Sequence, residues 1–534
     1  MKLTQIERTQ TYSNPHSNTH TYKFTKLLHY ATLDYVYKHI LLLPLFNFVV
    51  QFQEIHKSTA EKTKMESKAP TRILLVSYPA QGHINPLLRL AKCLAAKGSS
   101  VIFTTTKKAG SEMQTVSNIT DKTVTKIGDG SLSFDFFDDG LNDDDPMREN
   151  LSDYTSQLEH VGKQYVSQLI KNQAESETPI SCIINNIFIS WVCDVATENE
   201  IPFAILWSES SAVLTIYYNY FHKLVAFPSK TEPYIDVHLP SVILKHNEIP
   251  DLLHPFNGYH FRTVLVTLIL GQIKNLSKAL CVLVDTYEEL EHDFIDYISK
   301  KSVIIRPIGP LFKNLKTKGD FVKSDDSSDI IEWLNSKPED SVVYISFGTI
   351  VHLPQGQVNE IAYGLLDSQV SFLWALRQQD DLPNGFLEET NGRGKVVKWC
   401  PQVQVLSNPS VACFITHCGW NSSMEALASG VPVLTFPDVG DQITNAKFLV
   451  DFFRVGIRLG YTRAEKKLVT RDDVKKCLLE AMEGPKAEEL KQNAMKWKKA
   501  ANGAVVAGAG SSDRSLDAFL EDIKSCGAVN IQNI

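Results

Sequence analysis

The chain has 534 residues, 43% of them hydrophobic and 22% charged, which is enough for two large domains that each bury a core. Its formal net charge is −7, so the composition gives no basic surface for binding nucleic acid or an anionic membrane. The nine cysteines are odd in number and scattered, with no CxxC pair. This usage favours reduced thiols in a cytosolic protein.

Residues 1–64 differ in composition from the rest of the chain, because they are rich in Thr, Tyr, His and Asn and contain very few acids. Their apolar stretch, residues 40–50, is about half the ~20 residues that a membrane span needs, and Pro44 and Asn47 interrupt it. It also lies too far along the chain for an ordinary secretory signal. The segment is either a transit peptide or, as we expect, a disordered extension or gene-model artefact, with Met65 beginning the functional protein.

From residue 72 onward, short apolar runs alternate with amphipathic stretches. Residues 72–77 predict a buried strand, and Asn85 followed by Pro86 predicts a helix that begins there and stops at Gly98. A second series opens with the strand predicted at residues 341–348. Such alternation is typical of an α/β fold whose parallel sheets are covered by helices on both faces.

The polar segment 316–329 has no periodicity and predicts a linker between two domains. We therefore expect an N-terminal domain at residues 65–315 and a C-terminal domain at residues 330–510. An amphipathic terminal helix and tail follow at residues 511–534, where Leu, Phe and Ile recur at helical spacing.

The most specific feature is the segment from Trp399 to Gln442. Residues 411–416 predict a buried strand, and residues 420–429 a short helix that Gly430 terminates. The first turn of such a helix presents unpaired N–H groups and the positive end of the helix dipole, which together favour a phosphate group.

Polar side chains gather at this predicted helix start. Asn421 and Ser422 add donors, and His417 approaches from the end of the strand. Glu425 lies four residues after Asn421 on the same helical face, where a carboxylate can accept hydrogen bonds from ribose hydroxyls. A pyrophosphate with a sugar on either side fits this arrangement.

The segment resembles the signature box of plant family 1 UDP-glycosyltransferases in length and in nearly all of its diagnostic residues. The resemblance implies the GT-B arrangement, in which two Rossmann-like, doubly wound domains face a cleft. The N-terminal domain then binds the acceptor, the C-terminal domain binds the UDP-sugar, and the terminal helix packs back toward the N-terminal domain. One departure is visible, since residues 438–440 (Asp-Val-Gly) stand where many members have an aromatic residue.

The resemblance also implies which residues bind the donor, and they follow the UDP-sugar from the base to the hexose. They are Trp399, Cys400 and Gln402 for the uracil and nucleoside, Glu425 for the ribose, His417, Asn421 and Ser422 for the phosphates, and Trp420, Asp441 and Gln442 for the sugar. Gly82, in the loop after the first strand of the N-terminal domain, and Ser346, in the first strand of the C-terminal domain, complete the expected donor-binding set.

The loop after the first strand carries the expected catalytic base. Residues 78–86 do not form the GxGxxG of dinucleotide binders, so a nicotinamide oxidoreductase lacks its main signature. The loop places His83 at the carboxyl end of the strand, the usual ligand position in open α/β folds and the position of the family's general base. In most relatives an aspartate orients this histidine, and the matching position here is Asn186.

The exchange to Asn186 bears on the acceptor. An amide can hold an imidazole tautomer but cannot stabilise the imidazolium by charge, which matters for a phenol of pKa ~10 and not for an ionised carboxylic acid. Residues 185–186, 191–194 and 239–255 resemble the branch that makes glucose esters of hydroxycinnamates, gallate and limonoids. We therefore predict an inverting UDP-glucose-dependent glucosyltransferase that forms a β-glucose ester of a small plant acid. Asp194 is a second candidate orienter, for which a structural role is expected.

Three alternatives stay open. One is transfer to phenolic or terpenoid hydroxyls, another is a UDP-sugar epimerase on the same architecture, and the third is a non-catalytic UDP-sugar binder. Ser208 is a candidate for the sugar 6-hydroxyl or an ordinary residue at the end of a strand.

We expect no metal and no cofactor, because the aspartate-rich residues 135–145 match no metal-binding loop and UDP-glucose is itself a substrate. The expected partners are the UDP-sugar and a small acceptor, without nucleic acid and without a membrane span. We expect the protein to be a cytoplasmic monomer.

Overall fold

The computed structural model describes residues 71–117, 122–176, 178–256, 261–314, 328–349, 351–377, 382–460 and 468–531. The extension 1–64 and nearly all of the linker expected at 316–329 lie outside these ranges. The expected domain boundaries therefore stay predictions. Residues 70–534 form one compact unit, which contains both of the large sheets.

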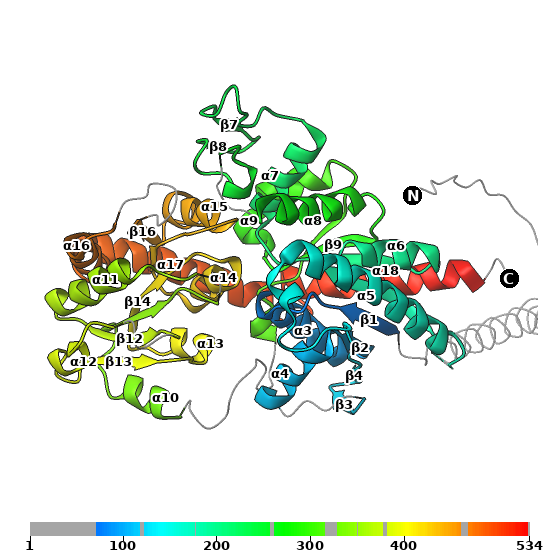
Figure 1. Cartoon of the computed structure of the whole chain (residues 1–534), viewed down its shortest axis with the longest axis horizontal. Helices are drawn as coiled ribbons and strands as arrows, with labels where there is room; N and C mark the ends of the chain where they lie inside the picture. Colours follow the sequence, from blue (N-terminus) through cyan, green and yellow to red (C-terminus); the bar gives the residue numbers. More distant parts are fainter. Residues whose placement is uncertain are drawn as a thin grey trace, which may run out of the picture. The chain divides into compact units, whose positions relative to one another are not determined.

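The N-terminal half of this unit is built on an eight-stranded sheet in the order β10-β9-β6-β5-β1-β2-β4-β3 (Figure 1). Neighbouring strands are parallel except for β3 and β4, which are antiparallel. The strands are β1 (Arg72–Val76), β2 (Ser100–Thr104), β3 (Val124–Ile127), β4 (Gly130–Phe134), β5 (Ile180–Asn186), β6 (Phe203–Trp207), β9 (Cys281–Val284) and β10 (Ile305–Pro307).

Helices follow the strands of this half, as the alternating pattern predicts. They are α3 (Gln81–Ala96), α4 (Lys107–Ser117), α5 (Leu151–Ala174), α6 (Trp191–Glu198), α7 (Ser211–His222), α8 (Arg262–Asn275) and α9 (Glu288–Ser299). Shorter elements are the 3₁₀ turns η2 (Pro146–Glu149), η3 (Asp251–Leu253) and η4 (Leu311–Asn314), and the antiparallel pair β7 (Val237–His238) and β8 (Ile243–Leu244).

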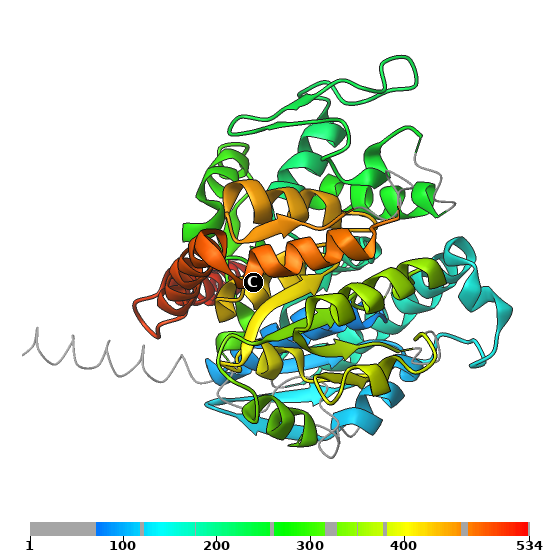
Figure 2. The same ribbon diagram turned by 90° about the vertical axis from the view of Figure 1, so that its left-hand side faces the viewer.

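The C-terminal half contains a six-stranded, entirely parallel sheet in the order β13-β12-β11-β14-β15-β16, drawn mainly in green, yellow and orange in Figure 2. Its strands are β11 (Val342–Ser346), β12 (Ser371–Ala375), β13 (Gly394–Val397), β14 (Val411–Thr416), β15 (Val433–Thr435) and β16 (Gly456–Arg458). Its helices are α10 (Ser328–Asn335), α11 (Gln355–Ser368), α12 (Phe386–Glu389), α13 (Gln402–Leu406), α14 (Trp420–Ser429), α15 (Gln442–Lys447), the π turn η6 (Phe448–Phe452), α16 (Arg471–Met482) and α17 (Gly484–Ala504). Two helix-covered sheets, one entirely and one mainly parallel, confirm the predicted α/β class.

The two halves share one apolar cluster. Phe294 of α9 packs against Phe448, the first residue of η6, with ring centroids 5.4 Å apart. The same cluster contains Trp420 of α14 and residues of β1, β5 and β6. Burial of this cluster contributes to holding the two halves together.

The last helix, α18 (Ser511–Ile531), packs on the N-terminal sheet, beside which its red ribbon lies in Figure 1. Its apolar residues are buried together with residues of β1, β2 and α3; they are Leu516, Phe519, Leu520 and Ile523. Lys97 at the end of α3 forms ion pairs with Asp513 and Asp517 of α18, at 2.8 and 2.6 Å. The N-terminal half is therefore completed by the C-terminal end of the chain.

The beginning of α3 differs from the sequence prediction. The helix begins at Gln81 rather than at the predicted Asn85–Pro86, so Pro86 lies inside it. Proline lacks the N–H that would bond to the carbonyl four residues earlier, which belongs to Gly82. The side-chain amide of Asn421 donates to that carbonyl instead, at 3.2 Å, so the interior proline leaves no acceptor unpaired.

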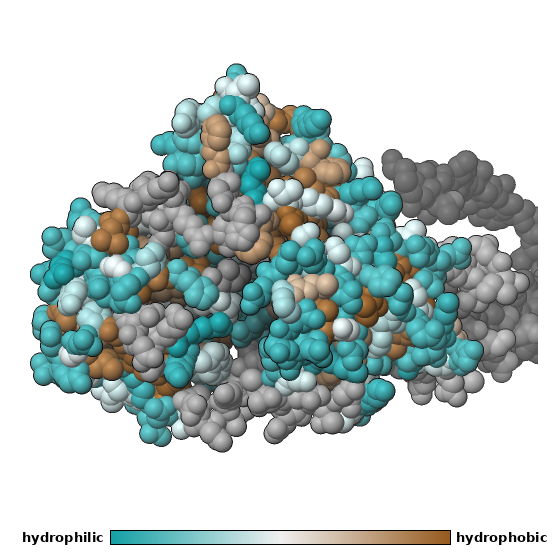
Figure 3. Space-filling view, viewed as in Figure 1, coloured by the Kyte–Doolittle hydropathy of each residue, from teal (hydrophilic) through white to brown (hydrophobic). Residues whose placement is uncertain are grey.

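No helix among the described residues has the length and apolar character needed to cross a membrane. Figure 3 shows a face that is mostly hydrophilic at its projecting parts, with hydrophobic side chains mainly in recesses.

Candidate active site

The structure brings two helix starts together at the carboxyl ends of the two central strands. Helix α3 follows β1 in the N-terminal half, and α14 follows β14 in the C-terminal half. Their first turns are in contact, since Asn421 of α14 donates to the carbonyl of Gly82 in α3. Ligands of open α/β sheets bind at this edge, so the contact marks the candidate site.

His83 lies in the first turn of α3 between two aromatic rings. Its centroid is 5.3 Å from that of Tyr78 and 4.6 Å from that of Phe188. Its Nδ1 atom is buried without a hydrogen-bond partner. Burial lowers the pKa of His83 from 6.5 to about 4, so the ring is neutral at cellular pH.

Asn186, the last residue of β5, does not contact the His83 ring. Its Nδ2 donates to Ser77 Oγ at 3.1 Å and to the main-chain carbonyl of His83 at 3.4 Å, and its Oδ1 accepts from the Tyr78 N–H at 3.1 Å. The expectation that this amide holds the imidazole tautomer therefore finds no ring contact, because the amide is bonded to the loop between β1 and α3. A catalytic contribution of Asn186 stays a prediction, now through the position of the loop.

The other candidate orienter, Asp194, lies on α6 with its side chain 55% exposed and 3.9 Å from Lys163. This surface ion pair fits the structural role that was expected for it.

His417 lies between β14 and α14, and its ring packs closely against two glycines. A Cβ atom at Gly348 would lie 2.7 Å from the His417 ring, and one at Gly419 would lie 2.5 Å from its Nε2. Burial lowers the pKa of His417 to about 4, opposed by a hydrogen bond with the Ser346 main chain. Its Nδ1 atom, like that of His83, is buried without a partner. The neutral ring is fixed at the start of α14, where the phosphates are expected.

The start of α14 has the geometry expected of an anion site. Its N-cap is Gly419, which has no side chain to cap the first turn. Asn421 in that turn is half-buried, with its Oδ1 buried and without a partner, and Ser422 is 7% exposed. Free N–H groups and the helix dipole therefore remain available to a phosphate.

The residues expected to bind the nucleoside form one hydrogen-bonded group. Gln402 Nε2 donates to Glu425 Oε2 at 2.9 Å and to Ser422 Oγ at 2.8 Å. The Tyr344 hydroxyl donates to Gln402 Oε1 at 3.0 Å and lies 3.2 Å from the Cys400 sulfur. These hydrogen bonds fix the Gln402 amide and the Glu425 carboxylate relative to each other.

Trp399 differs from these buried neighbours, because it is 36% exposed. An indole that is partly open to solvent is available to stack on a base.

At the sugar end, the Trp420 side chain is not available for a ligand. It is 3% exposed, and its indole N–H donates to the Asp285 carbonyl at 2.9 Å. Of the contacts expected for Trp420, the structure therefore leaves only those of its main chain.

Asp441 and Gln442 begin α15. Asn445 Nδ2 donates to Asp441 Oδ2 at 2.7 Å, and burial raises the pKa of Asp441 to about 6. Gln442 Oε1 accepts from the N–H groups of Asp438 and Val439, which turns its amino group away from that loop. A carboxylate and an amide donor side by side can bind adjacent sugar hydroxyls.

Two charged residues at the site were missed by the sequence analysis. Glu209 follows β6, and its Oε2 is buried without a partner; burial and then the charge of Asp441 raise its pKa well above the usual range. Arg89 of α3 forms a buried ion pair with Glu425, at 2.7 Å. A charged residue on the apolar face of a predicted helix was the available signal for Arg89, and an acid directly after a buried strand was the signal for Glu209. Ser208 beside it is 8% exposed.

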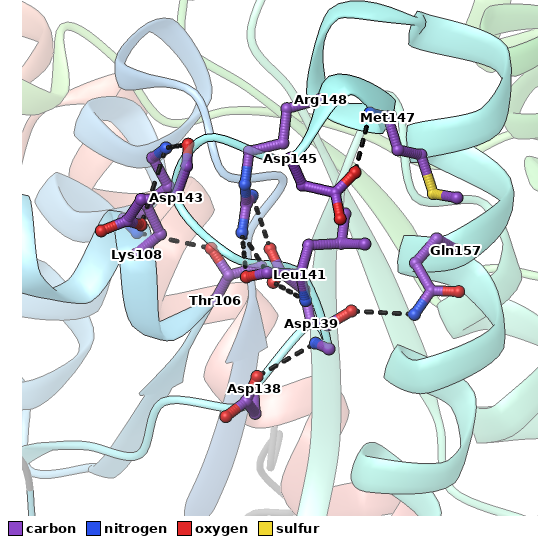
Figure 4. A network of polar contacts seen from close by, with 12 residues as sticks. Thr106, Lys108, Asp138, Asp139, Leu141, Asp143, Asp145, Met147, Arg148 and Gln157 are labelled. Carbon is purple, nitrogen blue, oxygen red and sulfur yellow. Dashed lines mark hydrogen bonds and ion pairs between the residues drawn. The ribbon is translucent and has the colours of Figure 1, made fainter.

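The aspartate-rich segment 135–145 forms contacts within the protein (Figure 4). Arg148 donates to both oxygens of Asp139, at 2.8 and 2.9 Å, and Asp145 accepts from the Met147 N–H at the start of η2. Asp143 lies 3.7 Å from Lys108. In the part of the chain that the structure describes, no group of three or more His, Cys, Asp or Glu is placed to hold a metal ion. The absence of a metal from the reaction stays a prediction.

Comparison with known proteins agrees with this site. Residues 272–501, which include the whole segment from Trp399 to Gln442, match the family described as UDP-glucoronosyl and UDP-glucosyl transferase. A gallate 1-beta-glucosyltransferase of Punica granatum is 52% identical over 86% of this chain and 90% of its own length. The chain belongs to this family. It is a UDP-glycosyltransferase.

Other relatives of this UDP-glycosyltransferase bear related names. A limonoid UDP-glucosyltransferase of Citrus unshiu is 51% identical, over 86% of this chain and 91% of the relative. A cinnamate beta-D-glucosyltransferase of Fragaria ananassa is 50% identical, over 87% of this chain and 84% of the relative.

Solved structures confirm the GT-B fold of the UDP-glycosyltransferase. Os79 from O. sativa, in complex with U2F and trichothecene, has a TM-score of 0.72 at 25% identity, covering 84% of this chain and 100% of Os79. UGT2 of Phytolacca americana, with UDP-2fluoro-glucose and pterostilbene, has a TM-score of 0.69 at 24% identity, covering 85% of this chain and 99% of that chain.

Proposed function

We propose that this enzyme transfers glucose from UDP-glucose to the carboxylic acid of a small plant metabolite, with inversion, to give a β-glucose ester. The acid is a phenolic acid such as a hydroxycinnamate or gallate, or a limonoid. The relatives named for gallate, cinnamate and limonoid support this class, each about half identical to this chain. Family membership favours glycosyl transfer over the epimerase and non-catalytic alternatives.

The observation that carries the acid acceptor is the surroundings of His83. Among the described residues no carboxylate contacts its ring, and burial lowers its pKa to about 4. A base of that pKa is poorly matched to a phenol of pKa ~10, whereas a carboxylic acid of pKa ~4 reaches the site already ionised. The acid acceptor therefore needs no proton removed, and His83 is left to position it.

The donor lies with its phosphates at the start of α14. The acceptor carboxylate attacks the anomeric carbon, the new carbon–oxygen bond forms, and the bond to the β-phosphate oxygen breaks with its electron pair leaving on UDP. The N–H groups of the first turn, His417, Asn421 and Ser422 surround the developing negative charge. Attack from the side opposite the leaving group converts the α-linked donor into a β-linked ester.

The deciding experiment replaces the Asn186 amide with a carboxylate and compares two classes of acceptor. We expect wild-type enzyme to show a higher kcat/KM for cinnamate-type acids than for a flavonol at neutral pH. Asn186→Asp should raise kcat/KM for the flavonol relative to kcat/KM for the acid, because a nearby negative charge raises the basicity of His83 and repels an anionic acceptor.

Asn186→Ala is the control, because it removes the side-chain contacts to the loop without adding a charge. It should not shift the ratio toward the flavonol. A wild-type preference for the flavonol would reject ester formation and favour transfer to phenolic or terpenoid hydroxyls.

The donor identity has its own test. Asp441 and Gln442 can bracket the equatorial hydroxyls of glucose, so UDP-glucose should outcompete UDP-galactose and UDP-glucuronate. A higher kcat/KM for either rival would reject UDP-glucose.

The proposal requires no metal and no cofactor, since the charge of UDP is met by protein groups. It places the enzyme in the cytosol as a monomer. All nine cysteines are free, and eight of them are buried, which suits a reducing compartment. Unchanged turnover after dialysis against EDTA and a single species of about 60 kDa in sedimentation are the expected results.

A further inference from the structure

A buried ion pair joins the two helices that form the site. Arg89 Nη2 of α3 lies 2.7 Å from Glu425 Oε1 of α14, and the two side chains are 5% and 6% exposed. The residues are 336 positions apart in the chain. Helix α3 carries His83 in its first turn, while the first turn of α14 faces the expected phosphates, so this contact connects the acceptor side with the donor side.

The Glu425 carboxylate is held at both oxygens. Arg89 bonds to Oε1, and Gln402 Nε2 donates to Oε2 at 2.9 Å. The Arg89 guanidinium also lies over the Phe312 ring, 5.5 Å from its centroid. Each carboxylate oxygen accepts about two hydrogen bonds, so Glu425 keeps free acceptor sites while Arg89 holds it.

Burial makes this contact consequential. An arginine keeps its charge at all relevant pH values, and a buried charge requires a partner. Breaking a buried pair strands the other charge, whereas an exposed pair of the same length would contribute little. Without Arg89, the Glu425 carboxylate would keep the Gln402 contact at Oε2 but would no longer be held at Oε1.

We propose that Arg89 is a positioning residue that aims the Glu425 carboxylate at the donor ribose. The inference rests on the proposed donor site, in which Glu425 binds the ribose hydroxyls. Recognition of the nucleoside then depends on a residue of the acceptor-binding half, and the donor is bound fully only when α3 and α14 are in contact.

The test compares UDP-glucose with its 2′-deoxyuridine analogue, and UDP with 2′-deoxy-UDP by calorimetry. A hydrogen bond to a charged group corresponds to a preference of about 10- to 150-fold for the hydroxylated ligand. We expect the wild-type enzyme to show this preference for the hydroxylated ligand. In both Glu425→Gln and Arg89→Met the preference should fall to within about threefold, while the acceptor KM should change little. A purely structural pair would alter stability and leave the preference intact.

Lys92→Met is the matched control, because it removes one positive charge from the same helix and should keep the wild-type preference. If Arg89→Met does not fold, Arg89→Lys retains the charge without the guanidinium fork and should show a reduced preference. A wild-type preference in a folded Arg89 variant overturns the inference.

The outcomes separate this inference from the donor site itself. A wild-type enzyme that binds both ligands equally would reject ribose binding by Glu425. A preference lost in Glu425→Gln but kept in the Arg89 variants would reject only the role of Arg89.

Discussion

Asp441 makes donor use depend on pH. Burial raises its pKa to about 6, and the hydrogen bond from Asn445 opposes that rise. The carboxylate accepts hydrogen bonds from sugar hydroxyls more strongly when it is ionised, so kcat/KM for UDP-glucose should be highest above about pH 6 and fall as the pH drops through that value. The check is a pH profile at saturating acceptor.

Asp441→Asn should lower donor kcat/KM by about 10- to 150-fold and remove this step from the profile. Asp451→Asn, which changes a carboxylate paired with Lys447, is the control and should keep the step. A step that persists unchanged in Asp441→Asn would assign it to another group.

At the scale of single elements, the turn between β14 and α14 depends on a small residue. Gly419 has φ −57°, which any residue adopts, so alanine there introduces no backbone strain. Its Cβ would lie 2.5 Å from His417 Nε2 and would displace the imidazole. We expect His417→Ala to lose about 2–4 kcal/mol of transition-state stabilisation, because it removes a contact to the leaving phosphate. Gly419→Ala should reduce donor kcat/KM by an amount that approaches this loss.

Gly356→Ala in α11 is the matched control, because nothing lies within 4 Å of the added methyl group. It should leave donor use unchanged. Equal activity of Gly419→Ala and wild type would show that the His417 position does not matter for the phosphates.

The same elements show which parts of the structure can be predicted from local sequence patterns. The strand at 411–416 and the helix at 420–429 follow from local apolar patterns and a terminating Gly430, and the structure has both at those bounds. The start of α3 was predicted five residues late, because Pro86 is tolerated inside the helix: the Gly82 carbonyl that it leaves without an N–H accepts from Asn421, which lies 339 positions from Gly82. The Arg89–Glu425 pair and the buried indole of Trp420 likewise depend on contacts between the halves, which no local pattern encodes.

At the scale of the whole molecule, two buried histidines make stability depend on pH. Folding lowers the pKa of His83 and of His417 from 6.5 to about 4. Between these values the unfolded chain binds more protons than the folded protein. The contribution of the two histidines to the free energy of unfolding is therefore fully present above about pH 6.5 and is lost as the pH falls toward 4. The free energy of unfolding in denaturant titrations should decrease over that range.

His417→Gln removes one of the two groups and should give a shallower decrease. His292→Gln, whose histidine is exposed beside Glu288, is the control. Parallel pH dependences of wild type and His417→Gln would contradict the assignment.

The final helix should contribute strongly to the stability of the N-terminal half. Phe519 is fully buried against the N-terminal sheet, so Phe519→Ala should reduce the free energy of unfolding by about 3–5 kcal/mol. Lys524→Ala on the exposed side of the same helix should have little effect. A Phe519→Ala protein as stable as wild type would show that α18 is dispensable for this half.

The position of α18 also has a consequence for synthesis of the chain on the ribosome. The strands of the N-terminal sheet are complete once β10 ends at Pro307, yet the α18 residues that complete the cover of one of its faces begin at Leu516. At about 5–20 residues per second, roughly 10–40 s separate these two points of translation. During that interval the nascent N-terminal half exposes the apolar residues that α18 will cover, which makes it a natural client for chaperones that bind emerging chains.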